Sequence, residues 1–356
     1  MAANAVPAAA DTLRIATFNV ELSRAGPGLL LRDILGGKDP QVDAVATIIA
    51  RTSPDILLLT GFDYDRGLAA LGAFADVLAH KDAAYAHIFA LRPNTGMMTD
   101  FDLDGDGRLR GPGDAQGFGN FAGEGGMAIL SRLPIDEPGL RDFSTYLWRD
   151  LPGNLTAEAG LTAEALANMR LSTTAHWDVP INLPDGQNLH LLAYYASPPV
   201  FDGPEDRNGR RNHDETAFWQ RYLDGDLPPA PPKQAFVIIG DANLDPVDGD
   251  GRRDGILALL ADPRLQDPAP QSPGARIAAS SDGGVNAGQK GNPARDTANW
   301  PADKGPGNLR IDYVLPSVDL NVTASGVWWP DPATNDGELA ITASRHRLVW
   351  VDLELP

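Results

Sequence analysis

The chain has 356 residues, of which 43% are hydrophobic, and this is enough to bury a sizeable core. Its formal net charge of −19 disfavours a protein that grips duplex DNA through the phosphates, because that grip needs clustered Lys and Arg. Cysteine is absent, which excludes disulfides, thiolate metal sites and cysteine nucleophiles.

Residues 1–12 are mostly small and lack the basic start and long apolar run of an intact secretory signal. We interpret them as a disordered stub of the kind that remains after a signal peptide is removed. We therefore expect the protein in the periplasm or outside the cell, with the cytoplasm as the alternative. No apolar run approaches the roughly 20 residues that cross a bilayer, so no membrane span is predicted, and we expect a monomer.

Apolar patterns predict strands that alternate with helices early in the chain and dominate later. A first strand at 13–20 is followed by helical spacing across 28–51, a buried strand at 56–59 and a helix at 68–78. Further strands are expected at 126–131, 177–181, 189–195, 235–239, 309–315 and 348–353.

Long loops rich in Gly, Pro and Asp are expected at 92–125, 198–215 and 265–308. The chain shows no repeat, and no linker separates two halves. We therefore interpret residues 13–356 as a single α/β domain with large functional loops.

Polar residues follow or interrupt several of these strands. Asn19 ends the first strand, Asp241 and Asn243 follow the strand at 235–239, and Asp312 and His346 accompany the last two. Carboxylate, amide and imidazole groups can together activate water, orient it and stabilise an oxyanion. Brought into one cleft, these residues predict a hydrolytic site.

The order and spacing of six segments resemble the endonuclease/exonuclease/phosphatase superfamily, the DNase I-like group. The segments are 17–21, 54–59, 126–132, 240–243, 310–313 and 346–347, and the block 198–215 resembles the exported bacterial branch. The resemblance spans about residues 13–353. It implies a four-layer α/β sandwich, with two packed mixed β-sheets flanked by helices. It also implies a hydrolase of phosphodiesters or phosphomonoesters that uses in-line attack of water.

The resemblance assigns a role to each of the polar residues. Asp241 matches the general base that activates water, and Asn243 and His346 match groups that bind phosphoryl oxygens. Asp312 matches a supporting carboxylate, and Asn19 matches an Asn that binds metal or phosphate. A divalent metal, Mg²⁺ or Mn²⁺, is the implied cofactor, and a small anionic phosphate ester is the implied substrate.

Three positions depart from the family pattern. Gly61 stands where the family has a metal-ligating Glu, so metal binding should be weaker. Tyr195 replaces a His, although its hydroxyl can still donate to a phosphoryl oxygen. Arg345 replaces the Asp that we expect to fix the tautomer of the final His, and an Arg there can hold a phosphate bidentately. Asp63 or Glu21 could supply the missing metal ligand.

These departures leave a second hypothesis open, a degenerate paralogue that binds a phosphorylated or other anionic ligand without turnover. Arg211 lies in the densest basic cluster of the chain, at 203–215. We expect it either to contact an anionic substrate or to belong to a surface ion-pair network.

A separate acidic motif lies in the first long loop. Asp102, Asp104 and Asp106 have the alternate spacing of an EF-hand calcium loop, but the usual Glu at its twelfth position is missing. Asp114 lies next to that position and could replace it. We therefore predict a structural Ca²⁺ at 102–114, with a solvated acidic turn as the alternative. Residues 245–254 form a weaker copy of the motif.

Overall fold

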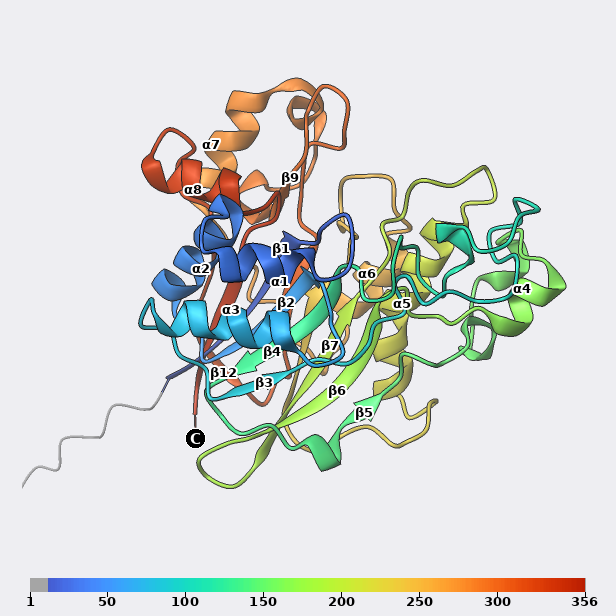
Figure 1. Ribbon diagram of the computed structural model, residues 1–356, viewed down its shortest axis with the longest axis horizontal. Coiled ribbons are helices and arrows are strands. Elements are labelled where there is room, and N and C mark those ends of the chain that lie inside the picture. Colours follow the sequence, from blue (N-terminus) through green and yellow to red (C-terminus); the bar gives the residue numbers. More distant parts are fainter. Residues whose placement is uncertain (1–11, 356) are drawn as a thin grey trace, which may run out of the picture.

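Two mixed β-sheets form the centre of the computed structural model, which describes residues 12–355 (Figure 1). The six-stranded sheet has the order β12 (Asn321–Val327), β13 (Val349–Glu354), β1 (Thr12–Leu22), β2 (Ile56–Phe62), β4 (Gly126–Ser131) and β3 (His87–Phe89). The five-stranded sheet has the order β11 (Asp312–Pro316), β8 (Phe236–Asp241), β7 (Asn188–Tyr195), β6 (Ala175–Asn182) and β5 (Arg141–Asp142). A small ribbon pairs β9 (Ala298–Asn299) with β10 (Asn308–Leu309).

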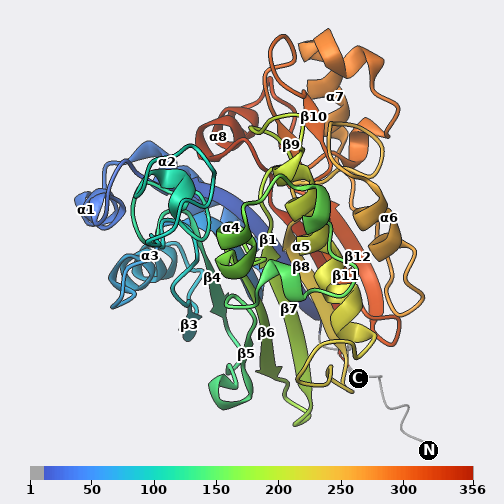
Figure 2. The ribbon, with the colours of Figure 1, turned by 90° about the vertical axis from the view of Figure 1, so that its right-hand side faces the viewer.

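Helices cover the outer faces of both sheets, as Figure 2 shows from the side. The helices are α1 (Leu29–Gly36), α2 (Pro40–Thr52), α3 (Ala69–Ala79), α4 (Ala163–Asn168), α5 (Arg207–Leu223), α6 (Asp254–Leu260), α7 (Pro273–Asp282) and α8 (Asn335–Ala343). No helix in the described part of the chain is long and apolar enough to cross a membrane.

Three large apolar clusters hold these layers together. One lies between the sheets and joins side chains such as Ile15 and Leu58 of the first sheet to Trp177 and Val237 of the second. Another packs α1, α2 and α3 on the six-stranded sheet, and the third packs α5 and α6 on the five-stranded sheet. The predicted four-layer α/β sandwich is therefore confirmed.

The two sheets present the ends of several strands at one edge of the molecule. Strands β1 and β2 pair in parallel, so Asn19 and Gly61 lie near the same strand ends. Strands β7 and β8 also pair in parallel and end at Tyr195 and Asp241. Parallel neighbours end on the same side of a sheet, so this topology gathers polar residues from distant parts of the chain.

The structure changes several predicted boundaries. The helical pattern at 28–51 is two helices, because Gly37 adopts a left-handed conformation and Pro40 starts a new helix. The strand at 309–315 divides into β10 and β11, and β12 was not predicted. Residue 12 begins β1, while the rest of the predicted N-terminal stub, residues 1–11, lies outside the described residues.

Part of the loop predicted at 198–215 is helical, since α5 begins at Arg207. The start of the helix was missed because the buried face of its first half carries charged side chains, among them Arg211, Asp214 and Glu215, and buried aromatic residues follow only in its second half. The loop predicted at 265–308 likewise contains α7.

Candidate active site

Three neighbouring strands of the five-stranded sheet place Asp241 between two other polar residues. Asp312 of β11 is directly opposite Asp241 of β8 in an antiparallel register. On the other side, Tyr195 of β7 is the parallel partner of Asp241. The side chains of such cross-strand partners lie close together, so the register brings these three residues into one group.

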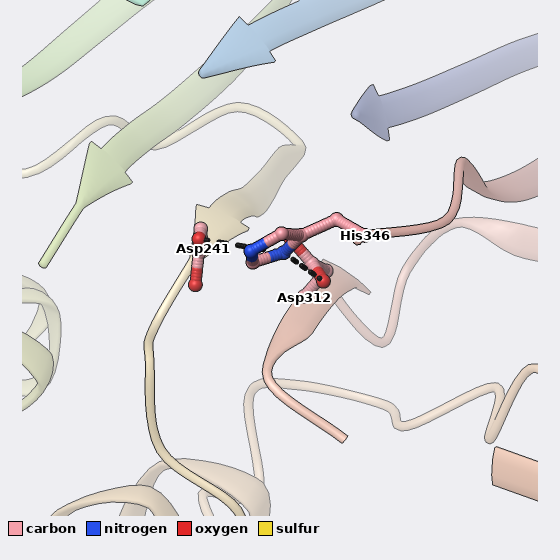
Figure 3. Close-up of side chains that lie close together, drawn as sticks. All are labelled: Asp241, Asp312 and His346. Carbon is pink, nitrogen blue, oxygen red and sulfur yellow. Dashed lines mark hydrogen bonds and ion pairs between the residues drawn. The ribbon is translucent and has the colours of Figure 1, made fainter. Parts of the chain in front are cut away.

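His346 completes the group from the segment between α8 and β13 (Figure 3). Its Nδ1 lies 3.1 Å from Asp312 Oδ2 and 3.7 Å from Asp241 Oδ2. One possible ligand atom from each of the three residues lies within 4.8 Å of the others, and all three side chains are buried. The imidazole also meets the ring of Trp300 edge to face, at 5.4 Å between centroids.

Two hydroxyl residues that the sequence interpretation missed hold this group in place. Thr297 Oγ1 donates to Asp312 Oδ2 at 2.8 Å and accepts the backbone N–H of Asp312. Ser344 Oγ donates to the backbone carbonyl of Asn19 and accepts the N–H of His346. Ser344 is part of the predicted motif beside His346, whereas nothing in the sequence marks Thr297, which lies in a predicted loop.

Burial and mutual charge shift the acid–base properties of the group. Burial, reinforced by repulsion from Asp312, raises the pKa of Asp241 to about 7. Burial opposes the charged form of His346, but Asp312 and Asp241 outweigh it and raise the pKa of the imidazole to about 9. The group therefore holds a protonated imidazole beside a carboxyl that titrates near neutral pH, and the protons belong to the group as a whole.

Asn19 of β1 connects the two sheets at this point. Its Nδ2 donates to Asp241 Oδ2 at 2.9 Å and to the Tyr195 hydroxyl at 3.2 Å. Burial, followed by the Asp241 charge, raises the pKa of Tyr195 above its ordinary value, so the phenol stays protonated. The structure thus brings together Asn19, Tyr195, Asp241, Asp312 and His346.

Asn243 reaches the site by a turn and not by strand alternation. Strand β8 ends at Asp241, and Asn243 has a φ of 48°, a left-handed conformation that Asn tolerates. Its N–H donates to Asp241 Oδ1 at 2.8 Å, and its side chain donates to the carbonyl of Ala196. Asn243 therefore helps to fix the Asp241 carboxylate.

Gly61 lies in β2 at a register shift and has a φ of +67°. A Cβ atom at this position would come within 2.4 Å of Asn19 Oδ1. Gly61 stands where the resemblance implies a metal-ligating Glu. In this backbone, any side chain at position 61 would collide with Asn19.

Arg345 forms an ion pair with Glu21 next to Asn19. Its Nε donates to Glu21 Oε1 at 2.7 Å, its backbone N–H donates to Oε2 at 2.8 Å, and its Nη2 also contacts Oε1. Burial would raise the pKa of Glu21, but the hydrogen bonds from Arg345 and the charges of His346 and Arg345 together outweigh burial and keep that pKa below its usual value. Arg345 itself is exposed, with 58% of its side chain accessible.

The structure corrects our explanation of the change at Arg345. We expected an acidic residue at that position to fix the tautomer of His346. In the structure Asp312 takes this part, because it accepts from Nδ1. The replacement of Asp by Arg at 345 therefore leaves the orientation of the imidazole intact.

Two other predicted site residues are engaged elsewhere. Asp63 accepts hydrogen bonds from Ser23 Oγ, Arg24 N and Gly125 N, which fix its carboxylate in a loop junction. Arg211 is buried, and its guanidinium donates to backbone carbonyls that include those of Leu171 and Gln116. Arg211 therefore holds loops together, in contrast to the expected substrate contact.

The acidic loop is separate from this group. Asp102, Asp104 and Asp106 each place one carboxylate oxygen within 4.8 Å of the others. Asp114 is buried and accepts the N–H groups of Leu103 and Gly111, so it closes the loop on the inner side.

Comparison with known proteins places this geometry in a family. The model of the endonuclease/exonuclease/phosphatase family matches residues 16–346. The chain belongs to this family. No curated protein matches it significantly.

Solved structures of this family and of a related enzyme share the fold. An endonuclease/exonuclease/phosphatase from Beutenbergia cavernae DSM 12333 has a TM-score of 0.57 and 18% identity, over 97% of this chain and 72% of that one. An endonuclease/exonuclease/phosphatase family protein from Leptotrichia buccalis C-1013-b has a TM-score of 0.54 and 16% identity, over 96% of this chain and 100% of that one. Sphingomyelinase C from Streptomyces griseocarneus has a TM-score of 0.51 and 15% identity, over 96% and 99% of the two chains.

Membership of the endonuclease/exonuclease/phosphatase family supports phosphoesterase chemistry in general, and members typically depend on a divalent metal. The oxygen atoms of Asn19, Glu21 and Asp241 suit a hard cation. His346 does not suit one in its present state, since a protonated imidazole has no lone pair for a metal. The fit to a metal therefore rests on the oxygen donors.

Proposed function

We propose that the protein hydrolyses a small phosphate ester, a phosphodiester or a phosphomonoester, at the Asp241 group. The observation that carries this proposal is the buried contact of His346 with Asp312 and Asp241. Burial and the charge of Asp312 raise the pKa of Asp241 to about 7, and the two carboxylates raise the pKa of His346 to about 9. A carboxylate poised near the working pH is suited to remove a proton from water. The imidazolium is suited to stabilise negative charge on a phosphoryl oxygen.

In this mechanism each group has one task. Asp241 takes the proton of the attacking water, and the N–H of Asn243 holds the carboxylate in position. Asp312 keeps His346 protonated by binding Nδ1, so the other ring nitrogen, Nε2, is left to donate to the phosphoryl group. The hydroxyl of Tyr195 and the amide of Asn19 supply further donors at the edge of the other sheet.

A divalent cation, when bound, would neutralise charge on the phosphoryl oxygens and lower the pKa of the attacking water. We propose Mg²⁺ or Mn²⁺, held by Asn19, Asp241 and Glu21, with weak affinity because no carboxylate is present at Gly61. Glu21 fits this part better than Asp63, since the Asp63 carboxylate is already held by three hydrogen bonds. Arg345 competes with the cation for Glu21, and released from Glu21 it can contact the phosphate.

The second candidate function is capture of a phosphorylated or other anionic ligand without turnover. The observation in its favour is the Glu21–Arg345 ion pair, which occupies a potential metal ligand with a cation of the protein itself. An imidazolium, a phenol and a guanidinium that can leave Glu21 can together bind phosphate without any metal.

The deciding experiment measures hydrolysis of bis(4-nitrophenyl) phosphate and 4-nitrophenyl phosphate in the presence of Mg²⁺, Mn²⁺ or Ca²⁺. We expect turnover with at least one combination of substrate and metal, and a loss of about 10³-fold in kcat/KM for Asp241→Asn. Asp250→Asn, a change in an exposed acidic loop, is the matched control and should keep full activity. If no substrate turns over but inorganic phosphate raises the Tm, the binding function replaces the enzymatic one.

We further propose that the protein acts outside the cytoplasm as a monomer and that duplex DNA is not its substrate. The strongly acidic composition supports the last point. Cell fractionation, size-exclusion chromatography and a plasmid-nicking assay test these three statements separately.

A further inference from the structure

A cavity of about 340 Å³ lies beside α7, and no residue that lines it belongs to the Asp241 group. Its walls come from α7, from the turn that follows α7, and from the acidic loop that follows β8. The volume is at the lower end of the range of pockets that hold small molecules. The α7 region stands at the outer edge of the molecule in Figure 1.

Asp296 gives this cavity a buried acceptor without a donor. The residue is only 6% exposed, and its Oδ2 is buried with no hydrogen-bond partner among the described residues. Burial, together with the charges of Asp245 and Asp248, raises the pKa of Asp296 to about 8. Asp296 lines the cavity, and buried carboxylates are normally paired, so an unpaired one in this wall indicates a missing positively charged partner.

Asp248 adds a second carboxylate to the wall, and this one is fixed in position. Its two oxygens accept the backbone N–H groups of Lys290 at 2.9 Å and Gly291 at 2.8 Å. These bonds leave its charge uncompensated, because backbone amides carry none. Asp248 and Asp296 therefore make one side of the cavity strongly acidic.

Asn286 gives the cavity a donor without an acceptor. Its Oδ1 accepts the N–H of Asn308 at 2.8 Å, and this bond settles which end of the amide is oxygen. The Nδ2 that remains is buried and has no partner within the part of the chain that the structure describes. A ligand that completes this cavity must therefore bring an acceptor as well as a positive charge.

A bare metal ion fits these features less well than an organic cation. Within residues 12–355, the groups of side chains close enough to share an ion are the Asp241 group and the loop at 102–106, and Asp296 belongs to neither. The volume also exceeds what one ion needs. An ammonium group, by contrast, donates to carboxylates from several directions and needs no fixed coordination.

We propose that this cavity binds a small polar molecule that carries an ammonium group next to a neutral oxygen, as an amino alcohol or an amino sugar does. The ammonium group lies against Asp296 and Asp248, and the oxygen accepts from Asn286. Arg276 lies on the exposed rim of the cavity and is one positive charge against the two carboxylates of Asp248 and Asp296. The net negative charge of the lining disfavours dianions.

The test measures the Tm of the full chain with methylammonium, ethanolamine and glucosamine, against ethylene glycol and glucose as neutral counterparts. We expect a saturable rise in Tm for ethanolamine or glucosamine, and none for the neutral compounds. In Asp296→Asn, the ligand concentration needed for the same rise in Tm should be at least tenfold higher. Asp250→Asn, on the same acidic loop but outside the lining, should keep it.

Ser280→Leu is a second variant, which fills the cavity from the exposed face of α7 and leaves the carboxylates untouched. It too should abolish the rise, so the test survives if Asp296→Asn fails to fold. The proposal is overturned if no ammonium compound gives a saturable rise or if the rise persists in both variants. It is also overturned if CaCl₂ alone reproduces an Asp296-dependent rise, since the cavity is then a metal site.

Discussion

The two sides of the candidate active site are built on opposite principles. On the side of the five-stranded sheet, Asp241, Asp312 and His346 are buried, charged and held by directed hydrogen bonds. On the side of the six-stranded sheet, Glu21 is neutralised by the exposed Arg345, and Gly61 offers no side chain at all.

This difference shows that the fold buries the Asp241 group and leaves the Glu21–Arg345 pair partly open to solvent. Burial and the charge of Asp312 raise the pKa of Asp241, and the two carboxylates raise the pKa of His346. Groups with pKa values shifted in this way are concentrated at sites of proton transfer. The exposed ion pair is worth little stability and can open when an anion or a cation arrives. The half to which we assign the acid–base chemistry is therefore fixed, whereas the half proposed to receive the metal or phosphate is adjustable.

The largest loss of activity is expected from a substitution in the buried Asp241 group, which is the fixed half of the site. Asp312→Asn replaces the charged acceptor of His346 Nδ1 with a neutral amide and so removes one of the charges that keep the ring protonated. We expect kcat/KM to fall about 10²- to 10⁴-fold while the Tm changes little. Thr297→Val removes the hydrogen bond to the Asp312 carboxylate and the acceptor of the Ile311 and Asp312 N–H groups, but it keeps the Asp312 charge, so its effect on activity should be smaller. Equal activity of Asp312→Asn and the wild type would remove Asp312 from the mechanism.

The pH dependence of the wild type tests the same half without a mutation. Asp241 must be ionised to accept a proton, so kcat/KM should rise as the pH passes about 7. His346 must be protonated to donate, so activity should fall again above about 9. In Asp312→Asn the pKa of His346 falls, and the alkaline limb should therefore move to lower pH. A flat profile between pH 6 and 10 would contradict this assignment.

A third test asks how closely Gly61 is fitted to its partner. Gly61→Ala places a Cβ 2.4 Å from Asn19 Oδ1 in a left-handed conformation, so Asn19 must move away from Asp241. We expect about 2–3 kcal/mol of lost stability and a loss of activity of about tenfold or more. Gly186→Ala is the matched control, since Gly186 has a φ of +85° but no atom near its added Cβ. Chemical denaturation of both variants separates backbone strain from the contact with Asn19.

A fourth test opens the Arg345–Glu21 ion pair of the adjustable half. Arg345→Ala frees the Glu21 carboxylate, and we expect Mn²⁺ to bind about fivefold more tightly, the equivalent of ~1 kcal/mol. Isothermal titration calorimetry measures this directly. The gain should vanish in the double variant Glu21→Gln/Arg345→Ala. Arg51→Ala, which breaks the exposed ion pair with Asp336, is the control and should leave Mn²⁺ affinity unchanged. Weaker Mn²⁺ binding by Arg345→Ala would exclude Glu21 as a ligand.

The smallest effect on activity is expected at the acidic loop, which touches neither half. If Asp102, Asp104 and Asp106 hold a Ca²⁺, saturating calcium should raise the Tm by about 3–6 °C. Asp104→Asn should remove most of this rise, and Asp100→Asn, just before the motif, should not. A rise that persists in Asp104→Asn would assign the ion to another place.

Local patterns in the sequence were sufficient for the fold and for the fixed half of the site. The strands β1, β2, β4, β6, β7, β8 and β13 follow apolar runs that the sequence shows directly. Asp241, Asp312 and His346 stand next to such runs, so their convergence followed from strand order. The α5 helix escaped prediction because the buried face of its first half is polar, and the apolar period is then confined to its second half.

The rest was decided by contacts between segments far apart in the chain. The Arg345–Glu21 pair joins residues 324 positions apart, and the bond from Thr297 to Asp312 depends on how a long loop returns to the sheet. The sequence by itself determined the family, the sandwich and the residues of the Asp241 group that lie together, because strand patterns and short motifs are local. Only the tertiary structure decided which charges are neutralised, which are buried and which face a cavity, because burial and pairing depend on where distant segments meet.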